Sequence, residues 1–172
     1  MPIAAPAHPH KHPAYRWGAT TLILALAGIL IALSAQYIGG MAPCPLCLQQ
    51  RYAYYFALPV LFVALVLLGA GRPSDAGILF LLVSLAFLAN AAIGTYHAGA
   101  EWKFWPGPDT CAGAGADLVK GGALLERLKN TVVVRCDEAA GRFLGLSFAG
   151  WNVFLSIALC ISTLRAAFET KS

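Results

Sequence analysis

Four long apolar segments constrain the fold of this chain more than any other feature of its sequence. A helix needs roughly 20 apolar residues to cross a bilayer core of about 30 Å while it satisfies its own backbone hydrogen bonds. Four segments meet this requirement, at residues 17–38, 46–68, 77–96 and 146–165. They predict an all-α membrane protein in which residues 1–172 form a single four-transmembrane-helix bundle.

Composition agrees with a membrane location. Of the 172 residues, 59% are hydrophobic and 12% are charged, whereas a soluble domain is about 45–50% apolar and about 25% charged. The net charge of +4 comes without a basic run interleaved with aromatic residues, which excludes nucleic acid as a partner.

The first apolar segment exceeds the roughly 7–15 residues of a secretory signal core, so we interpret it as a transmembrane helix. We expect residues 1–14 to be disordered and the protein to be a monomer surrounded by membrane lipid.

Four crossings place both termini on one side of the membrane and the loops 39–45 and 97–145 on the other. Basic residues lie on both sides, and those near the ends of the first three crossings favour cytoplasmic termini. The loop side carries four of the five cysteines, and disulfides persist in the periplasm but not in the cytosol. We therefore expect both loops to be periplasmic. In the second loop, the pattern predicts a short amphipathic helix at residues 121–130 and an extended segment at 131–135.

The sequence Cys44-Pro45-Leu46-Cys47 opens the second apolar segment. Proline suits the first helical position and moves the preceding residue out of the helical region, so Cys44 is the expected N-cap and Cys47 the third helical residue. Residues three apart at a helix start are close enough to form a disulfide. The positive helix end also stabilises a thiolate there. The pattern favours a reactive pair, with a structural disulfide or half of a zinc site as the alternatives.

Two polar residues are expected near this pair. Arg51 lies one turn beyond Cys47 on the same helix face, at the edge of the hydrocarbon region, where a guanidinium is costly and usually functional. The alternative is that its side chain extends to the lipid headgroups. His97 ends the third apolar segment at the same depth, where it is either a site residue or part of an interfacial aromatic belt.

The remaining cysteines and buried polar residues receive different interpretations. Cys111 follows a proline-rich strip that can lie extended in another protein's groove, although a clamp within the loop is the alternative. Cys111 and Cys136 are far apart in sequence, and zinc usually needs two close pairs, which disfavours a metal site.

Cys160, inside the fourth apolar segment, is expected to be an inert core residue. Asn90 and Asn152 are expected to form interhelical hydrogen bonds, and no role is assigned to Gln49 or Gln50.

Together these residues resemble the DsbB family, the quinone-linked disulfide-forming membrane proteins of bacteria. The resemblance covers nearly the whole chain. It rests on the order and spacing of four motifs: Cys44-Pro-Leu-Cys47-Leu-Gln-Gln-Arg51, His97 at the end of the third segment, Trp-Pro-Gly-Pro-Asp-Thr-Cys111, and Cys136 followed by Phe143-Leu-Gly-Leu.

The resemblance implies an enzyme of the bacterial inner membrane that reoxidises a periplasmic DsbA-type protein of thioredoxin fold. The partner's thiolate would attack a Cys111/Cys136 disulfide at Cys111, and electrons would then pass to Cys44/Cys47. Cys47 would reduce a quinone, either ubiquinone or menaquinone, that is held near Arg51 and His97, with no metal. Because DsbA is itself a strong oxidant, its reoxidation needs a still stronger electron acceptor.

Other classes of protein remain open at this point. A vitamin K epoxide reductase-like enzyme also combines a helix bundle, a CxxC motif and a quinone-like substrate, although the motif comes late in the chain of that family. A non-enzymatic membrane scaffold would use its disulfides only to stabilise the outer loops. A protein that supplies reductant outward would need an electron source on the cytoplasmic side, and no cysteine is predicted there to receive the electrons.

Overall fold

The structure, a computed structural model, describes residues 13–107, 136–139 and 141–171. Four long helices account for most of them: α1 (Pro13–Tyr37), α2 (Pro45–Gly69), α3 (Pro73–Glu101) and α6 (Phe148–Glu169). Each helix is long and apolar enough to cross a membrane. The predicted four-helix membrane bundle is therefore confirmed. The amphipathic helix and the extended segment predicted within residues 121–135 lie outside the described residues.

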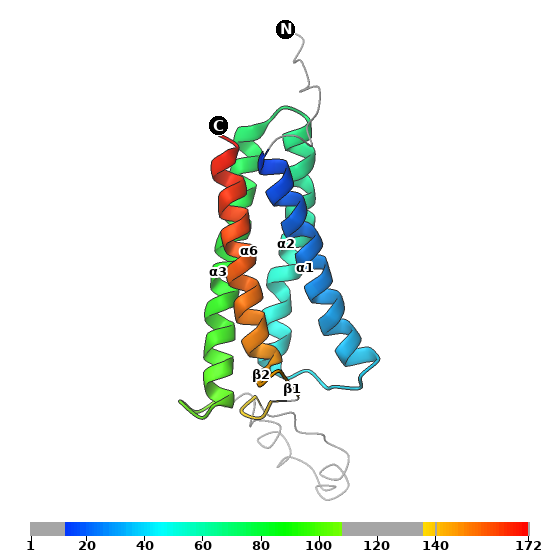
Figure 1. Cartoon of the computed structure of the whole chain (residues 1–172), viewed down its shortest axis with the longest axis vertical. Coiled ribbons are helices and arrows are strands. Elements are labelled where there is room, and N and C mark those ends of the chain that lie inside the picture. The colour runs from blue at the N-terminus through cyan, green and yellow to red at the C-terminus, as the bar shows by residue number, and fades with distance from the viewer. Residues whose placement is uncertain (1–12, 108–135, 140, 172) are drawn as a thin grey trace, which may run out of the picture.

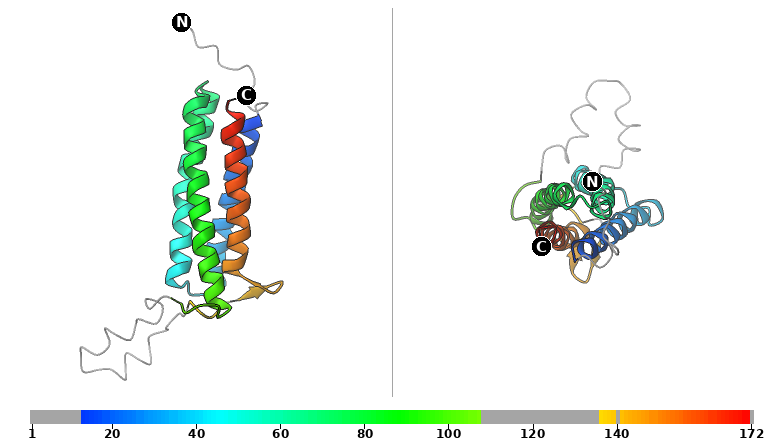
Figure 2. Two further views of the ribbon diagram at one scale, coloured as in Figure 1. Left: turned by 90° about the vertical axis from the view of Figure 1, so that its left-hand side faces the viewer. Right: turned by 90° about the horizontal axis from the view of Figure 1, so that it is seen from above.

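The four helices form a ring in which each packs mainly against two neighbours, in the order α1, α2, α3, α6. The start of α1, the end of α6 and the turn between α2 and α3 lie at one end of the bundle (Figure 1). The start of α2 and the end of α3 lie at the opposite end. α1 diverges from its neighbours toward that opposite end, and seen from above it projects out of the ring (Figures 1 and 2).

Prolines begin three of the four helices. Pro13, Pro45 and Pro73 are each the first helical residue, where a missing N–H costs no hydrogen bond. Pro13 and Ala14 therefore belong to α1 and not to the disordered segment predicted at residues 1–14. Ala14 is fully buried in the core of the bundle, and this packing extends the helix beyond the start that hydropathy indicates.

α3 continues beyond residue 96, its predicted end, as far as Glu101. The chain folds back over this last turn, so that the Trp105 indole N–H donates to the Tyr96 carbonyl oxygen at 2.8 Å and the two rings stack. The Trp105 ring occupies the space beside Gly99, where a Cβ would collide with it. His97 and Glu101 are consequently helical residues that lie one turn apart on the same face of α3.

A short antiparallel hairpin precedes α6 and is a feature that the sequence did not predict. β1 (Arg142–Phe143) pairs with β2 (Leu146–Ser147), so the helix predicted to begin at residue 146 begins later, at Phe148. Leu144 and Gly145 form the turn with φ values of 51° and 82°. Both lie in the left-handed region that tight two-residue turns require. The hairpin lies at the end of the bundle where α2 starts (Figure 1), and we call this end the hairpin end.

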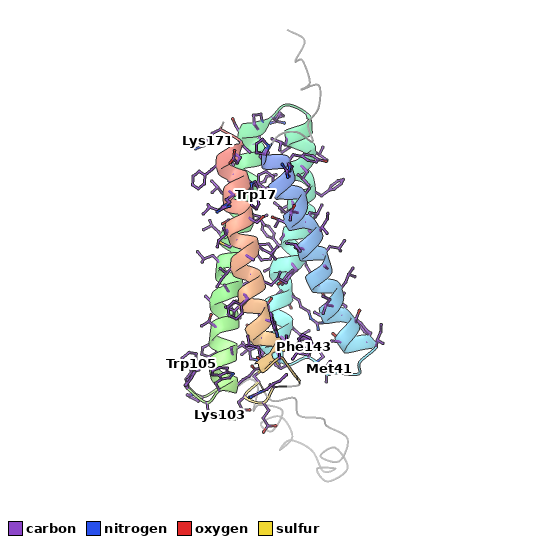
Figure 3. All side chains as sticks on the ribbon, viewed as in Figure 1. Trp17, Met41, Lys103, Trp105, Phe143 and Lys171 are labelled. Carbon is purple, nitrogen blue, oxygen red and sulfur yellow. The ribbon has the colours of Figure 1, made fainter. Side chains whose placement is uncertain are left out.

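Aromatic side chains lie at both ends of the bundle. Trp105 and Phe143 are at the hairpin end and Trp17 is near the opposite end (Figure 3). Tryptophan and other aromatic residues prefer the two membrane–water interfaces, so this distribution fits a bundle that spans the bilayer. Among the described residues, the buried interior consists of one large cluster formed by all four helices and one small cluster that contains Cys44 and Cys136.

Candidate active site at the hairpin end

The Cys44-Pro45-Leu46-Cys47 motif forms the first turn of α2. Cys44 is the N-cap, Pro45 is the first helical residue and Cys47 is the third, as predicted. The Cys44 sulfur accepts a hydrogen bond from the Cys47 backbone N–H at 3.2 Å, which satisfies one of the donors left free at a helix start. The two Sγ atoms lie 2.8 Å apart, and both residues are free thiols. The helix start therefore holds two thiols in contact.

The two thiols have different surroundings. Cys44 is only 3% exposed, whereas Cys47 is half-buried. The Cys44 thiol donates to the Cys47 sulfur, and this hydrogen bond, together with burial, raises the pKa of Cys44 above its ordinary value. The Arg51 cation and the Glu101 carboxyl group both act electrostatically on the Cys47 sulfur, with opposite effects. Cys44 thus keeps its proton, and Cys47 is the sulfur that accepts a hydrogen bond.

The spacing of the two sulfurs also bears on metal binding. Together with a ring nitrogen of His97, they lie within 4.8 Å of one another, which is a possible set of metal ligands. Two cysteines that bind one tetrahedral zinc ion at about 2.3 Å place their sulfurs about 3.8 Å apart. The observed separation of 2.8 Å is much shorter. Zinc binding would therefore require the two sulfurs to move apart, whereas disulfide formation requires them to move closer together.

His97 faces this pair from α3 and is buried, at 2% exposure. Its Nε2 atom lies 3.6 Å from the Cys44 sulfur and 3.6 Å from Oε1 of Glu101. The Glu101 side chain is also buried, and its other oxygen has no hydrogen-bond partner among the described residues. The structure thus brings His97 to the cysteine pair and adds a buried carboxyl group that the sequence pattern did not indicate. The available signal was an isolated acidic residue four positions after His97.

A chain of buried polar side chains continues from His97 into the bundle. Gln50 Nε2 lies 2.8 Å from His97 Nδ1, and Asn152 Nδ2 donates to Gln50 Oε1 at 2.6 Å. The Tyr54 hydroxyl group donates to Asn152 Oδ1 at 2.7 Å. The prediction that Asn152 forms an interhelical hydrogen bond is confirmed, as is that for Asn90, which donates to a serine of α6. Gln50, to which the sequence analysis assigns no role, is in direct contact with His97.

Arg51 reaches from α2 to α1. Its guanidinium group donates to the side-chain oxygen of Gln36 and to the carbonyl oxygen of Ala32, the latter at 3.3 Å. The side chain is therefore bound within the protein instead of extending freely to the lipid headgroups. Arg51 also lines a cavity next to Cys47. These bonds hold a cation at the cavity wall.

The cavity has a volume of about 650 Å³ and lies between α1, α2 and α6, with residues of α3 at its polar end. Phe143 of the hairpin and apolar side chains of α1 and α6 form most of its wall. Its polar lining is concentrated at the hairpin end of the bundle. The residues that line it include Ile31, Cys47, Arg51, His97, Phe148 and Leu155.

The other cysteines lie in two different places. Cys136 is fully buried, packs in one small cluster with Cys44 and is disulfide-bonded. Cys111 lies outside the described residues. Cys160 is a free thiol that packs against the large core cluster, with its sulfur 3.3 Å from the Ser84 hydroxyl oxygen. The structure therefore gathers Cys44, Cys47 and Cys136 at one site, and Cys160 is not part of it.

Fold and site together define a class of protein: a multi-pass membrane protein with two free thiols in contact and a disulfide-bonded cysteine at one end of its helix bundle. Comparison with protein families gives a narrower assignment. Residues 15–166 match the family described as disulfide bond formation protein DsbB, and the chain belongs to this family. Disulfide bond formation is an oxidoreductase role, and family membership assigns that role to the chain.

Similar proteins match over most of their length. The chain is 30% identical to disulfide bond formation protein B of Xylella fastidiosa over 164 residues, which cover 91% of this chain and 92% of that protein. It is 32% identical to the protein of the same name from Xanthomonas oryzae pv. oryzae over 157 residues, or 86% and 87% of the two chains. An uncharacterized protein of Rickettsia prowazekii is 26% identical over 155 residues, or 88% and 86%. No solved structure matches the chain significantly.

Proposed function

We propose that this protein is a quinone-dependent thiol oxidase of the bacterial inner membrane that reoxidises a periplasmic DsbA-type dithiol protein. The observation that carries the proposal is the cavity, because it connects the Cys47 sulfur with a largely apolar space among membrane-spanning helices. A lipid-soluble electron acceptor can occupy such a space. We place the hairpin end in the periplasm and both termini in the cytoplasm.

The cavity fits a quinone in size and in chemistry. Its volume of about 650 Å³ lies within the roughly 300–1,000 Å³ that is typical of small-molecule sites. The apolar wall suits an isoprenoid chain, and Arg51 and His97 offer N–H groups to the ring oxygens at the polar end. A bound quinone would accept two electrons and two protons. Ubiquinone and menaquinone both satisfy this description.

Two thiol–disulfide exchanges bring electrons to the cavity. A partner thiolate attacks a Cys111/Cys136 disulfide at Cys111, and the partner's second thiolate resolves the mixed disulfide, so the partner leaves oxidised and both loop cysteines are thiols. Cys136 then attacks a Cys44/Cys47 disulfide at Cys44, and Cys111 closes the loop disulfide again. The packing of Cys136 against Cys44 supports this second exchange.

The last step starts from the distribution of thiols seen in the structure, with Cys136 disulfide-bonded and Cys44 and Cys47 as free thiols. Both cysteines line the cavity, and Cys47 is the sulfur placed to react, because it is the less buried of the two and receives the Cys44 S–H hydrogen bond. Cys44 loses its proton as it closes the disulfide with Cys47. Two thiols become one disulfide, and the two electrons and both protons pass to the acceptor.

The proposal is tested with purified full-length protein, a reduced thioredoxin-fold dithiol protein and a soluble quinone, whose absorbance reports reduction. We expect wild type and Cys160→Ala to turn over at the same rate, and Cys47→Ser to lose turnover while remaining folded. Equal quinone reduction by wild type and Cys47→Ser would refute the oxidase. That result would favour the scaffold interpretation, in which the disulfides only stabilise the outer loops.

The vitamin K epoxide reductase-like alternative receives less support. The CxxC motif begins the second of the four helices, and the family match covers residues 15–166 with a family of disulfide-forming proteins. An epoxide substrate in the same assay provides a direct comparison. Consumption of the epoxide in preference to the quinone would revive this alternative.

A further inference from the structure

The polar chain from Tyr54 to His97 has a direction. Tyr54 is the donor to Asn152 Oδ1, which leaves the Asn152 amide nitrogen to donate to Gln50 Oε1. A side-chain amide has its donor on one atom and its acceptor on the other. Because the Gln50 oxygen accepts from Asn152, its nitrogen must face His97 Nδ1, where it lies at 2.8 Å. Each residue thus donates to the next one toward His97.

This direction determines which nitrogen of His97 carries a proton. The Gln50 amide nitrogen can only donate, so His97 Nδ1 must accept and is unprotonated. The hydrogen bond made by one ring nitrogen fixes the protonation of the other, which places the ring proton on Nε2. Protonation of Nδ1 as well would require Gln50 to turn and break its 2.6 Å bond with Asn152.

The surroundings of Nε2 support the same assignment independently. Nε2 faces two acceptors, the Glu101 carboxyl oxygen and the Cys44 sulfur, each at 3.6 Å. If Nε2 carried no proton, its lone pair would face the Glu101 carboxyl oxygen and the Cys44 sulfur. Acceptors that face each other without a hydrogen bond are costly in a buried site. An N–H group at Nε2 points a donor at two acceptors instead.

We propose that Gln50, oriented by Asn152 and Tyr54, is a positioning residue that keeps His97 as the neutral tautomer protonated at Nε2. His97 then serves the site as a hydrogen-bond donor toward the Cys44 sulfur and the cavity, and not as the acceptor of a thiol proton. The role of His97 in the reaction rests on the proposed function, whereas the assignment of its tautomer does not. The protons released by Cys44 and Cys47 consequently need an acceptor other than His97.

Nitrogen NMR of full-length protein labelled with 15N-histidine measures the tautomer in the reduced state, without quinone or partner. The chain has four histidines, and the spectrum of His97→Gln identifies the His97 signals. The protein must be purified without a histidine tag. We expect a protonated Nε2 and an unprotonated Nδ1 in the wild type. A proton on Nδ1, or on both nitrogens, would overturn the proposal.

Gln50→Glu provides the decisive variant at a pH above the pKa of the introduced carboxyl group, because an ionised carboxylate cannot donate and forces Nδ1 to carry a proton. Gln49→Glu is the matched control, since Gln49 is adjacent in sequence but exposed on the outer face of α2. We expect the tautomer to change in the first variant and not in the second. An unchanged His97 spectrum in folded Gln50→Glu protein would contradict the proposal.

Tyr54→Phe tests the far end of the chain and remains informative if Gln50→Glu does not fold. It removes the donor to Asn152 while keeping the ring, so we expect both tautomers of His97 to become populated. Tyr55→Phe is its control, because the Tyr55 side chain is 48% exposed. A wild-type spectrum in Tyr54→Phe would show that this chain does not orient Gln50. If the tautomer is as proposed but quinone reduction is absent, the proposed function fails and this inference stands.

Discussion

Cys47 and Cys160 are both half-buried free thiols in membrane-spanning helices, yet their surroundings differ completely. Cys47 lies in the first turn of α2, accepts a hydrogen bond from the Cys44 thiol and lines the cavity. Cys160 lies in the middle of α6 beside Ser84, against the large core cluster. Two half-buried thiols thus lie in different surroundings. We therefore expect helix position and neighbouring groups, rather than exposure, to decide which of the two thiols is reactive.

The most direct way to break this comparison is to measure alkylation rates. With the loop disulfide intact, we expect a membrane-permeant maleimide to modify Cys47 faster than Cys160 by on the order of a hundredfold, because the reactive species is the thiolate and the helix start stabilises it. Peptide mass spectrometry over a time course resolves the two sites, and Cys47→Ser confirms the assignment. Similar rates at the two cysteines would show that their surroundings do not set their reactivity.

A smaller effect is expected when the cation near Cys47 is removed. Arg51→Met keeps the length of the side chain but loses its charge and its N–H groups, so we expect the KM for quinone to rise about tenfold, equivalent to about 1.4 kcal/mol. Partner-thiol attack at the loop disulfide should be preserved. Saturation kinetics with a soluble quinone measure the first quantity, and mixed-disulfide trapping measures the second.

Gln36→Leu is the control for this variant. It removes the side-chain partner that Arg51 has on α1 but keeps the cation. We expect its KM to change less than that of Arg51→Met. If both variants raise KM equally, Arg51 affects quinone affinity by tying α2 to α1 and not through its charge.

The features that the sequence predicted are those with strong local causes. Apolar length determined the four helices, because a membrane leaves a spanning segment few alternatives to a helix. Pro45 determined the first turn of α2, since proline fixes its own φ and restricts Cys44 before it. The N-cap role of Cys44 and the position of Cys47 both follow from that one residue and were confirmed.

The features that the sequence missed depend on contacts between distant residues. Gln50 is one of three consecutive polar residues, with Gln49 and Arg51, in an otherwise largely apolar helix, and its partners come from two other helices, 47 and 102 positions away. The sequence shows each of these residues but not their contact. Two-residue strands are too short to show an alternation of apolar and polar residues, so no pattern in the sequence indicated the hairpin. The end of α3 depends on Trp105 packing over Gly99, which is also a tertiary contact.

The smallest effect is expected from substitution of Cys160, the cysteine that we expect to be inert in the comparison with Cys47. Cys160→Ala removes one sulfur from a half-buried position against the core, so we expect a loss of about 1 kcal/mol in the free energy of unfolding. Thermal unfolding in detergent measures this loss, and quinone turnover should stay within the error of wild type. Ser84→Ala is the matched control, because it removes the neighbouring hydroxyl group and keeps the sulfur. A folded Cys160→Ala protein with reduced turnover would place Cys160 in the electron path, and helix position would then no longer separate the two thiols.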